Sequence, residues 1–203
     1  MIGGITMDTK LMYNSSIIRA LYFAGKAHKE QVRKGSDEIP YLVHPVEVAM
    51  ILKDNNMSED IIVAGLLHDI LEDTEKNKAD IEKEFGSNVL NLVIGASEEL
   101  EGRDKRAWKE RKEHTIQHLS GATFDIKCVS CADKLSNIRS MIMDYEVIGD
   151  ELWERFNEKN PCEQKWYYDG LVESLKELEQ YDMYKEFKCS VHHLFKKANC
   201  GGV

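Results

Sequence analysis

The sequence predicts an all-α protein that folds as a single domain, and three observations lead to this prediction. Apolar residues recur at helical spacing along most of the 203-residue chain. Only 3 prolines interrupt the chain, and no internal repeat or Pro/Gly-rich linker divides it. Hydrophobic residues make up 42% of the composition and charged residues 31%, as in a folded chain with a sizeable core. We therefore expect a helical bundle.

The sequence of the first half of the chain predicts four helices. Residues 15–27 form the first, and a polar loop that contains a glycine covers 34–40. The second helix, 45–53, opens with a proline, which a first helical turn tolerates. A serine that can cap a helix precedes the third, 59–72, and apolar residues at amphipathic spacing indicate the fourth over 80–94.

The sequence of the second half predicts a charged connecting segment followed by further helices. Residues 98–117 are dense in charge and are expected to form a solvated loop that opens a helix. Apolar spacing resumes over 122–144. Asn160 followed by Pro161 is typical of a capped helix start, and the helical pattern continues over 166–178. One or two short helices are expected to close the chain.

We divide the chain into three parts. Residues 1–14 form an N-terminal segment, residues 15–145 the helical core, and residues 146–203 a set of C-terminal helices that pack on the same domain. Aromatic residues are frequent in the third part, and we expect them to contribute to the core rather than to the edge of a lid. They are Trp153, Phe156, Trp166, Tyr167 and Tyr168.

The charge of the chain argues against nucleic acids and membranes as partners. The 27 basic and 36 acidic side chains give a net charge of −9 at pH 7. Phosphate backbones and anionic lipids do not attract a net anion, so a phosphorylated ligand must be held by a local group of cations. No apolar stretch approaches the roughly 20 residues of a membrane span, and residues 1–13 lack the pattern of a secretory signal. We expect a cytoplasmic protein.

The five cysteines are expected to be free thiols in that reducing compartment. Cys128 and Cys131 form one CxxC pair. A zinc site would need two more soft ligands at similar spacing, and none is obvious in the sequence. We therefore interpret the pair as small buried hydrophobic residues.

The third expected helix carries a concentration of residue types that bind metals. At about 100° per residue, His68, Asp69, Glu72 and Asp73 share one arc of this helix. Gly65 projects into the same arc, where a missing side chain leaves room for an ion, a water or a ligand. A solvated helix face usually includes lysine or arginine, whereas this arc holds no cation, and its carboxylates repel one another unless a metal compensates them. We expect a divalent metal, Mn²⁺, Fe²⁺, Zn²⁺ or Mg²⁺, rather than a polar face that meets water.

Several separated motifs, in order, resemble the HD phosphohydrolase superfamily. His44-Pro45 is followed by His68-Asp69, and Asp133 lies downstream within the run 132–139. Three further segments are similar to the hydrolase domain of the RelA/SpoT family, and they cover residues 27–34, 40–45 and 66–74. That family removes the 3′-pyrophosphate from the alarmones ppGpp and pppGpp. The resemblance extends over roughly residues 15–141 and implies an HD-domain helical bundle.

The resemblance also implies the roles of individual residues. One metal ion, Mn²⁺ in that family, is expected to be held by His44, His68, Asp69 and Asp133. Glu72 and Asp73 match the acidic pair that positions and activates the attacking water. The residues that match the nucleotide-binding positions are Arg33, Lys34, Tyr41 and Asn137.

The chain departs from the family pattern at three places near the expected nucleotide pocket. The loop between Arg33 and His44 is about two residues longer than usual by comparison of the motifs, which leaves the base-binding side least defined. Ser136 stands where a histidine is customary, and residues 94–97 replace a customary Gly-Val-Thr. Another phosphorylated nucleotide or cofactor therefore remains an alternative substrate. A third possibility is a non-catalytic module that binds alarmones. The intact acidic pair argues against it, because a binding module needs no residues that activate water.

His114 and His118 are spaced i, i+4 and could present two imidazoles on one helical face. Dinuclear HD enzymes place ligands of a second metal in this way. The neighbouring charged residues favour an ordinary exposed face instead. We therefore expect one metal ion and keep the second as an alternative.

Overall fold

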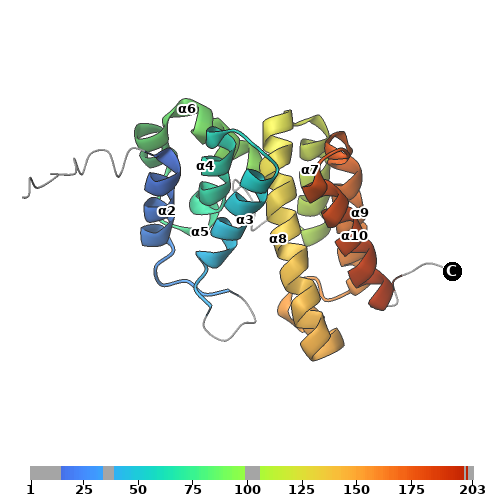
Figure 1. Ribbon diagram of the computed structural model, residues 1–203. Helices are drawn as coiled ribbons and strands as arrows, with labels where there is room; N and C mark the ends of the chain where they lie inside the picture. The colour runs from blue at the N-terminus through green and yellow to red at the C-terminus, as the bar shows by residue number, and fades with distance from the viewer. Residues whose placement is uncertain (1–14, 34–38, 99–105, 199, 201–203) are drawn as a thin grey trace, which may run out of the picture.

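The computed structural model describes residues 15–33, 39–98, 106–198 and 200, and it is almost wholly helical (Figure 1). The α-helices are α2 (Ser16–Ala27), α3 (Val43–Asp54), α4 (Glu59–Leu67), α5 (Ile70–Asp73), α6 (Lys78–Ala96), α7 (Trp108–Gly121), α8 (Phe124–Ile148), α9 (Pro161–Ser174) and α10 (Asp182–Lys197). Two 3₁₀ segments are η2 (Gly149–Arg155) and η3 (Lys176–Leu178). Within the described residues, β pairing is limited to an isolated bridge between Val32 and Pro40. The all-α prediction is confirmed.

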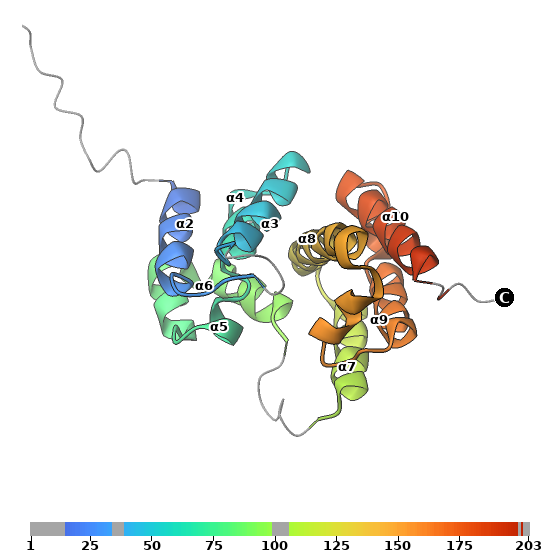
Figure 2. The same ribbon diagram turned by 90° about the horizontal axis from the view of Figure 1, so that it is seen from below.

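Helix α8 is the central element of the bundle. It packs against α3, α4 and α6 on one side and against α10 and η2 on the other, while α7 packs against α9 (Figures 1 and 2). A helix covered on two sides needs small or apolar residues around much of its circumference. Cys128, Cys131, Leu135 and Ile138 meet this need and are buried. Burial raises the pKa of the Cys128 thiol to about 12, so this CxxC pair packs as neutral side chains.

Side-chain caps define several helix starts. Asn160 accepts a hydrogen bond from the backbone N–H of Cys162, with Pro161 in the first turn, as predicted. Asn77 and Asp80 form a capping box that starts α6 at Lys78, slightly before the predicted start. Ser58 precedes α4 in an extended conformation, but its side chain makes no capping hydrogen bond.

The prediction of one continuous helix over 59–72 is wrong. Helix α4 ends at Leu67 and α5 begins at Ile70, so that His68 and Asp69 form the turn between them. The side chain of His68 stabilises this turn, because its Nδ1 lies 2.9 Å from the carbonyl oxygen of Gly65. A two-residue turn therefore separates the acidic residues of α5 from α4.

Gly65 does not face the polar residues, contrary to our expectation, but lies against α3. A Cβ at this position would be 2.5 Å from Cδ1 of Leu52 and 3.2 Å from Cγ1 of Val48. Both of these side chains are fully buried. The glycine therefore allows α3 and α4 to approach closely, which sets the spacing between the histidines that the two helices carry.

The aromatic residues after α8 contribute to the core. Trp153, Tyr167 and Tyr168 are buried, whereas Phe156 and Trp166 are half-buried and pack against them. Trp153 stacks on Phe195 of α10 at a centroid distance of 5.8 Å. No helix in the described part of the chain is long and apolar enough to cross a membrane.

Gly65→Ala tests the close contact between α3 and α4. We expect the free energy of unfolding to fall by about 1–3 kcal/mol, the usual cost of overpacking a core. Urea denaturation in excess chelator measures it without a contribution from bound metal. Gly121→Ala is the matched control, because a Cβ there meets nothing within 4 Å. Equal stability of the two variants would contradict the packing role of Gly65.

Candidate metal centre and adjoining cavity

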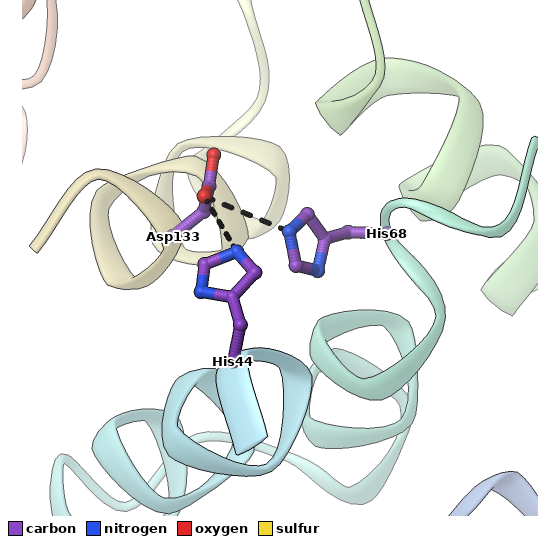
Figure 3. A group of neighbouring side chains, drawn as sticks. All are labelled: His44, His68 and Asp133. Carbon is purple, nitrogen blue, oxygen red and sulfur yellow. Dashed lines mark ion pairs between the residues drawn. The ribbon is translucent and has the colours of Figure 1, made fainter. Parts of the chain in front are cut away.

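Three helical elements bring two imidazoles and a carboxylate to one point in the interior (Figure 3). His44 comes from the first turn of α3, His68 from the end of α4 and Asp133 from α8. Nε2 of His44 is 3.2 Å from Oδ1 of Asp133, and Nε2 of His68 is 3.6 Å from the same oxygen. All three side chains are buried, and one ligand atom from each lies within 4.8 Å of the others.

The chemistry of His68 fits a bound cation. A carbonyl oxygen only accepts, so the contact with Gly65 places a proton on Nδ1 of His68 and leaves the lone pair of a neutral ring on Nε2. This buried Nε2 makes no hydrogen bond within the described residues. It faces Oδ2 of Asp69 at 3.0 Å and Oδ1 of Asp133 at 3.6 Å. A lone pair that faces two carboxylates needs a positive charge between them, supplied by a proton or a metal.

The carboxylates are ionised, as metal ligands must be. Burial works against the charge of Asp133, but the Lys134 ammonium, 2.7 Å from its Oδ2, and the two histidines hold its pKa well below the usual range. Burial likewise opposes the charge of Asp69, and His68 outweighs it and lowers the Asp69 pKa. In the metal-free site, burial disfavours protonation of His68, yet Asp69 and Asp133 raise its pKa well above the ordinary value. The residues therefore fit a divalent cation.

Tyr41 connects Asp69 with the acidic residues of α5. Its hydroxyl donates a hydrogen bond to Asp69 and lies 3.4 Å from Oδ2 of Asp73. Burial and the charge of Asp69 raise the pKa of Tyr41 far above the ordinary value, so the hydroxyl keeps its proton and acts as a donor. Its ring packs at a tilt against His28, a buried histidine whose Nδ1 is 2.6 Å from Oε1 of Gln31.

Glu72 and Asp73 occupy different positions around the centre. Oε1 of Glu72 accepts a hydrogen bond of 2.7 Å from the backbone N–H of Glu98, and this side chain lines the cavity beside the metal-binding group. Asp73 is more exposed, and its backbone carbonyl accepts a hydrogen bond of 2.6 Å from Gln31. The structure thus brings both acids close to the metal-binding group from one short helix.

A cavity of about 850 Å³ opens beside the metal-binding residues. That volume is within the range of sites that bind nucleotide-sized ligands. Tyr41 and Asn137 line it, and Asn137 donates a hydrogen bond of 2.6 Å to Oδ1 of Asp133. Four lysines supply positive charge around its wall, namely Lys76, Lys78, Lys112 and Lys134. The cavity therefore brings lysine side chains together with the metal-binding group.

One of the residues expected to bind the nucleotide, Arg33, does not line this cavity. Arg33 is half-buried, its backbone N–H donates to the carbonyl of Ile39, and it is not among the cavity-lining residues. Its neighbour Val32 pairs with Pro40 in an isolated antiparallel bridge. Lys34 lies outside the described residues.

His114 and His118 also line the cavity, but neither belongs to the compact metal-binding group found among the described residues. Nε2 of His118 is 2.9 Å from the carbonyl oxygen of Gly95, and this contact requires the proton on Nε2. Within the described part of the chain, the group compact enough to hold an ion is that of His44, His68 and Asp133.

Several residues of the site were missed by the sequence analysis. Lys134 directly follows the predicted ligand Asp133 in the sequence, and this position could have indicated that it belongs to the site. Glu98 and Lys112 lie in the segment that we expected to be solvated, yet Oε2 of Glu98 is 3.0 Å from Nζ of Lys112 and both are largely buried. Arg111 binds the other oxygen of Glu98 at 2.7 Å. No sequence pattern indicates these contacts, because α7 carries them from the far side of the cavity.

Comparisons with known proteins agree with the geometry. Residues 20–152 match the HD domain family. A Xenopus tropicalis protein named guanosine-3′,5′-bis(diphosphate) 3′-pyrophosphohydrolase MESH1 is 37% identical over 62% of this chain and 69% of its own length. Human MESH1 is 30% identical over 90% of this chain and 94% of its own. Other relatives are much longer: the chain covers 19% of RSH3 from Arabidopsis thaliana, a probable chloroplastic GTP diphosphokinase, at 36% identity.

Solved structures share the fold. The crystal structure of lmo0812 from Listeria monocytogenes superposes with a TM-score of 0.67 at 34% identity, over 75% of this chain and 99% of that one. A metazoan orthologue of SpoT superposes with a TM-score of 0.72 at 23% identity, over 92% and 97% of the two chains. The match to the family spans well over half of the sequence and includes every element that supplies the metal-binding group. The chain therefore belongs to the HD domain family.

Proposed function

We propose that this chain is a divalent-metal-dependent phosphohydrolase that removes the 3′-pyrophosphate from ppGpp and pppGpp. The observation that carries the proposal is the His44, His68 and Asp133 group at one end of a lysine-lined cavity of about 850 Å³. The MESH1 relatives, which bear the name of this activity at 30–37% identity, support the choice of substrate.

The donor set indicates which ions suit the centre. Imidazole nitrogens and carboxylate oxygens suit Mn²⁺, Fe²⁺ and Zn²⁺, and we propose Mn²⁺ held by His44, His68, Asp69 and Asp133. When bound, such an ion polarises a phosphoryl oxygen and lowers the pKa of a coordinated water.

The residues of the chain supply the remaining parts of the reaction. We assign proton removal from the attacking water to Glu72, whose Oε1 is held by the backbone N–H of Glu98, together with Asp73. Tyr41 donates to Asp69 and so fixes the orientation of that carboxylate. The lysines that line the cavity, Lys76 and Lys78 together with the carboxylate-paired Lys112 and Lys134, lie where they can compensate the charge of a polyphosphate.

One observation favours a second candidate, a phosphohydrolase of another phosphorylated nucleotide or cofactor. Arg33, one of the residues expected to bind the nucleotide, is not among the residues that line the cavity. The two candidates therefore share the metal centre and differ in the base that they recognise.

A substrate panel separates the two candidates. Purified protein with Mn²⁺ is incubated with ppGpp, pppGpp, their adenine counterparts and nucleoside 2′- and 3′-monophosphates, and products are resolved by anion-exchange chromatography. We expect ppGpp and pppGpp to lose pyrophosphate with the highest kcat/KM. Faster turnover of an adenine or monophosphate substrate would replace the guanine assignment. Tight binding of ppGpp without any turnover would indicate a non-catalytic module.

Replacing the acidic pair separates catalysis from metal binding. Glu72→Gln and Asp73→Asn retain side-chain size but remove the proton acceptor, so each is expected to lower kcat by about 10²- to 10⁴-fold. Metal content should remain near that of the unaltered protein, since neither residue is among the four ligands that we propose. Single-turnover hydrolysis and metal analysis measure the two effects. Near-normal rates in both variants would exclude the acidic pair as the proton acceptor.

Metal binding should release a proton and strengthen with pH. In the metal-free site the pKa of His68 is raised, so its proton is present below that pKa and must leave when an ion binds. That proton stabilises the metal-free fold below the unfolded-state pKa of about 6.5, and the stabilisation is lost as pH rises through the raised pKa. We therefore expect the difference in Tm between Mn²⁺ and chelator to widen with pH.

Differential scanning fluorimetry across pH, with calorimetry in buffers of different ionisation enthalpy, measures this behaviour. His114→Gln is the control, because this imidazole lines the cavity but lies outside the metal-binding group, and it should leave the pH profile unchanged. A pH-independent difference in Tm would argue against His68 as a ligand.

A further inference from the structure

A chain of hydrogen bonds leads from the metal-binding group to the surface. Nδ1 of His44 is 2.9 Å from Oγ of Ser136, and this hydroxyl is 2.8 Å from Oε2 of Glu47. Oε1 of Glu47 is 3.0 Å from Nη1 of Arg139, and Arg139 forms two further bonds, of 2.6 and 2.7 Å, with Glu186. These hydrogen bonds join α3, α8 and α10, and they end at a surface groove lined by Glu47, Arg139 and Glu186.

The positions of the protons in this chain follow from the chemistry of its members. An ionised carboxylate only accepts, so the single hydroxyl proton of Ser136 points to Glu47. The lone pairs of Oγ are then available to His44, whose Nδ1 must carry a proton and donate it. Nε2 of the neutral ring is left with a lone pair, and it is this nitrogen that faces Oδ1 of Asp133 at 3.2 Å.

Arg139 determines the direction in which the hydrogen bonds of this series are donated. A guanidinium only donates, so the oxygen of Glu47 that faces it must be an acceptor. Ser136 is fully buried, while Glu47 and Arg139 are about one third exposed, so the chain is least accessible where it meets the histidine. Ser136 is also the position at which the sequence departs from the customary histidine of the family it resembles.

We propose that Ser136 and Glu47 are positioning residues that hold His44 as the Nδ1–H tautomer and so present its Nε2 to the metal. Arg139 acts indirectly, because its hydrogen bond to one side-chain oxygen of Glu47 leaves the other oxygen to accept from Ser136. Such partners of a metal-binding histidine typically contribute 10- to 100-fold in metal affinity. This role presupposes the metal centre of the proposed function, but it is independent of the substrate.

Glu47→Gln provides a specific test, because an amide offers both a donor and an acceptor. Arg139 should select the amide oxygen, and the NH₂ group then faces Ser136. The serine proton would turn to Nδ1 of His44, and the ring would carry its own proton on Nε2, where the metal binds. We expect affinity for Mn²⁺, measured by calorimetric titration of metal-free protein, to fall about 10- to 100-fold.

The double variant Glu47→Gln/Arg139→Met should restore the affinity. Without the guanidinium the amide can rotate, its oxygen can accept from Ser136, and the original tautomer returns. Arg139→Met alone should change the affinity less than about threefold, since Glu47 still accepts from Ser136 by either oxygen. Glu177→Gln, which alters a remote ion pair with Lys127, is the matched control. Unfolding in chelator establishes that each variant is folded.

The tautomer of His44 is also observable without any substitution. Long-range ¹H–¹⁵N spectra of the Zn²⁺-loaded protein should show Nδ1 of His44 as protonated and Nε2 as the coordinated nitrogen. An Nδ1-coordinated ring, an unchanged affinity in Glu47→Gln, or a double variant as weak as Glu47→Gln would each overturn the positioning role. If the unaltered protein bound neither Mn²⁺ nor Zn²⁺, the metal centre itself would fail, and the positioning role with it.

Discussion

An ionised carboxylate in the interior, that of Asp133, is the constraint on which the rest of the structure depends. It is buried on the central helix α8, with Lys134 at 2.7 Å and two imidazoles on its other side. A buried charge is tolerated only when it is paired and hydrogen-bonded, and its partners must come from separate elements to surround it. The packing of α3 and α4 on α8 supplies those partners, so the bundle and the candidate metal centre are formed by the same contacts.

The cavity shows how a protein of net charge −9 can accept a polyanion. His44, His68 and Asp133 meet where a cation fits, and the lysines that line the cavity come from segments far apart in the sequence. Lys112 is held by Glu98, whose backbone N–H also contacts Glu72. The position of the proposed proton acceptor is thereby coupled to the helix that forms the opposite wall.

The helices were largely predictable, because apolar spacing is a local property of the sequence, and the order of the motifs singled out the three residues that the structure brings together, His44, His68 and Asp133. The break in the helix at His68 was not predictable, since helical spacing gives no indication that an imidazole will bind the carbonyl of Gly65. The packing of Gly65 depended on α3, a partner that a helical projection omits. The contact of Glu98 with Arg111 and Lys112 joins a connecting segment to α7, and charge density alone suggested a solvated loop. Tertiary contacts decided each of these cases.

The distribution of the candidate ligands along the chain bears on when the site can form during synthesis. His44 and His68 belong to neighbouring helices and can approach each other early, but Asp133 follows the whole of α6 and α7. The ordering of such a distant segment carries a loop-closure cost that local helix formation does not. A nascent chain that still lacks α8 would therefore hold two imidazoles without their central carboxylate. Metal capture becomes a late event, and one that reports the completed docking of α8.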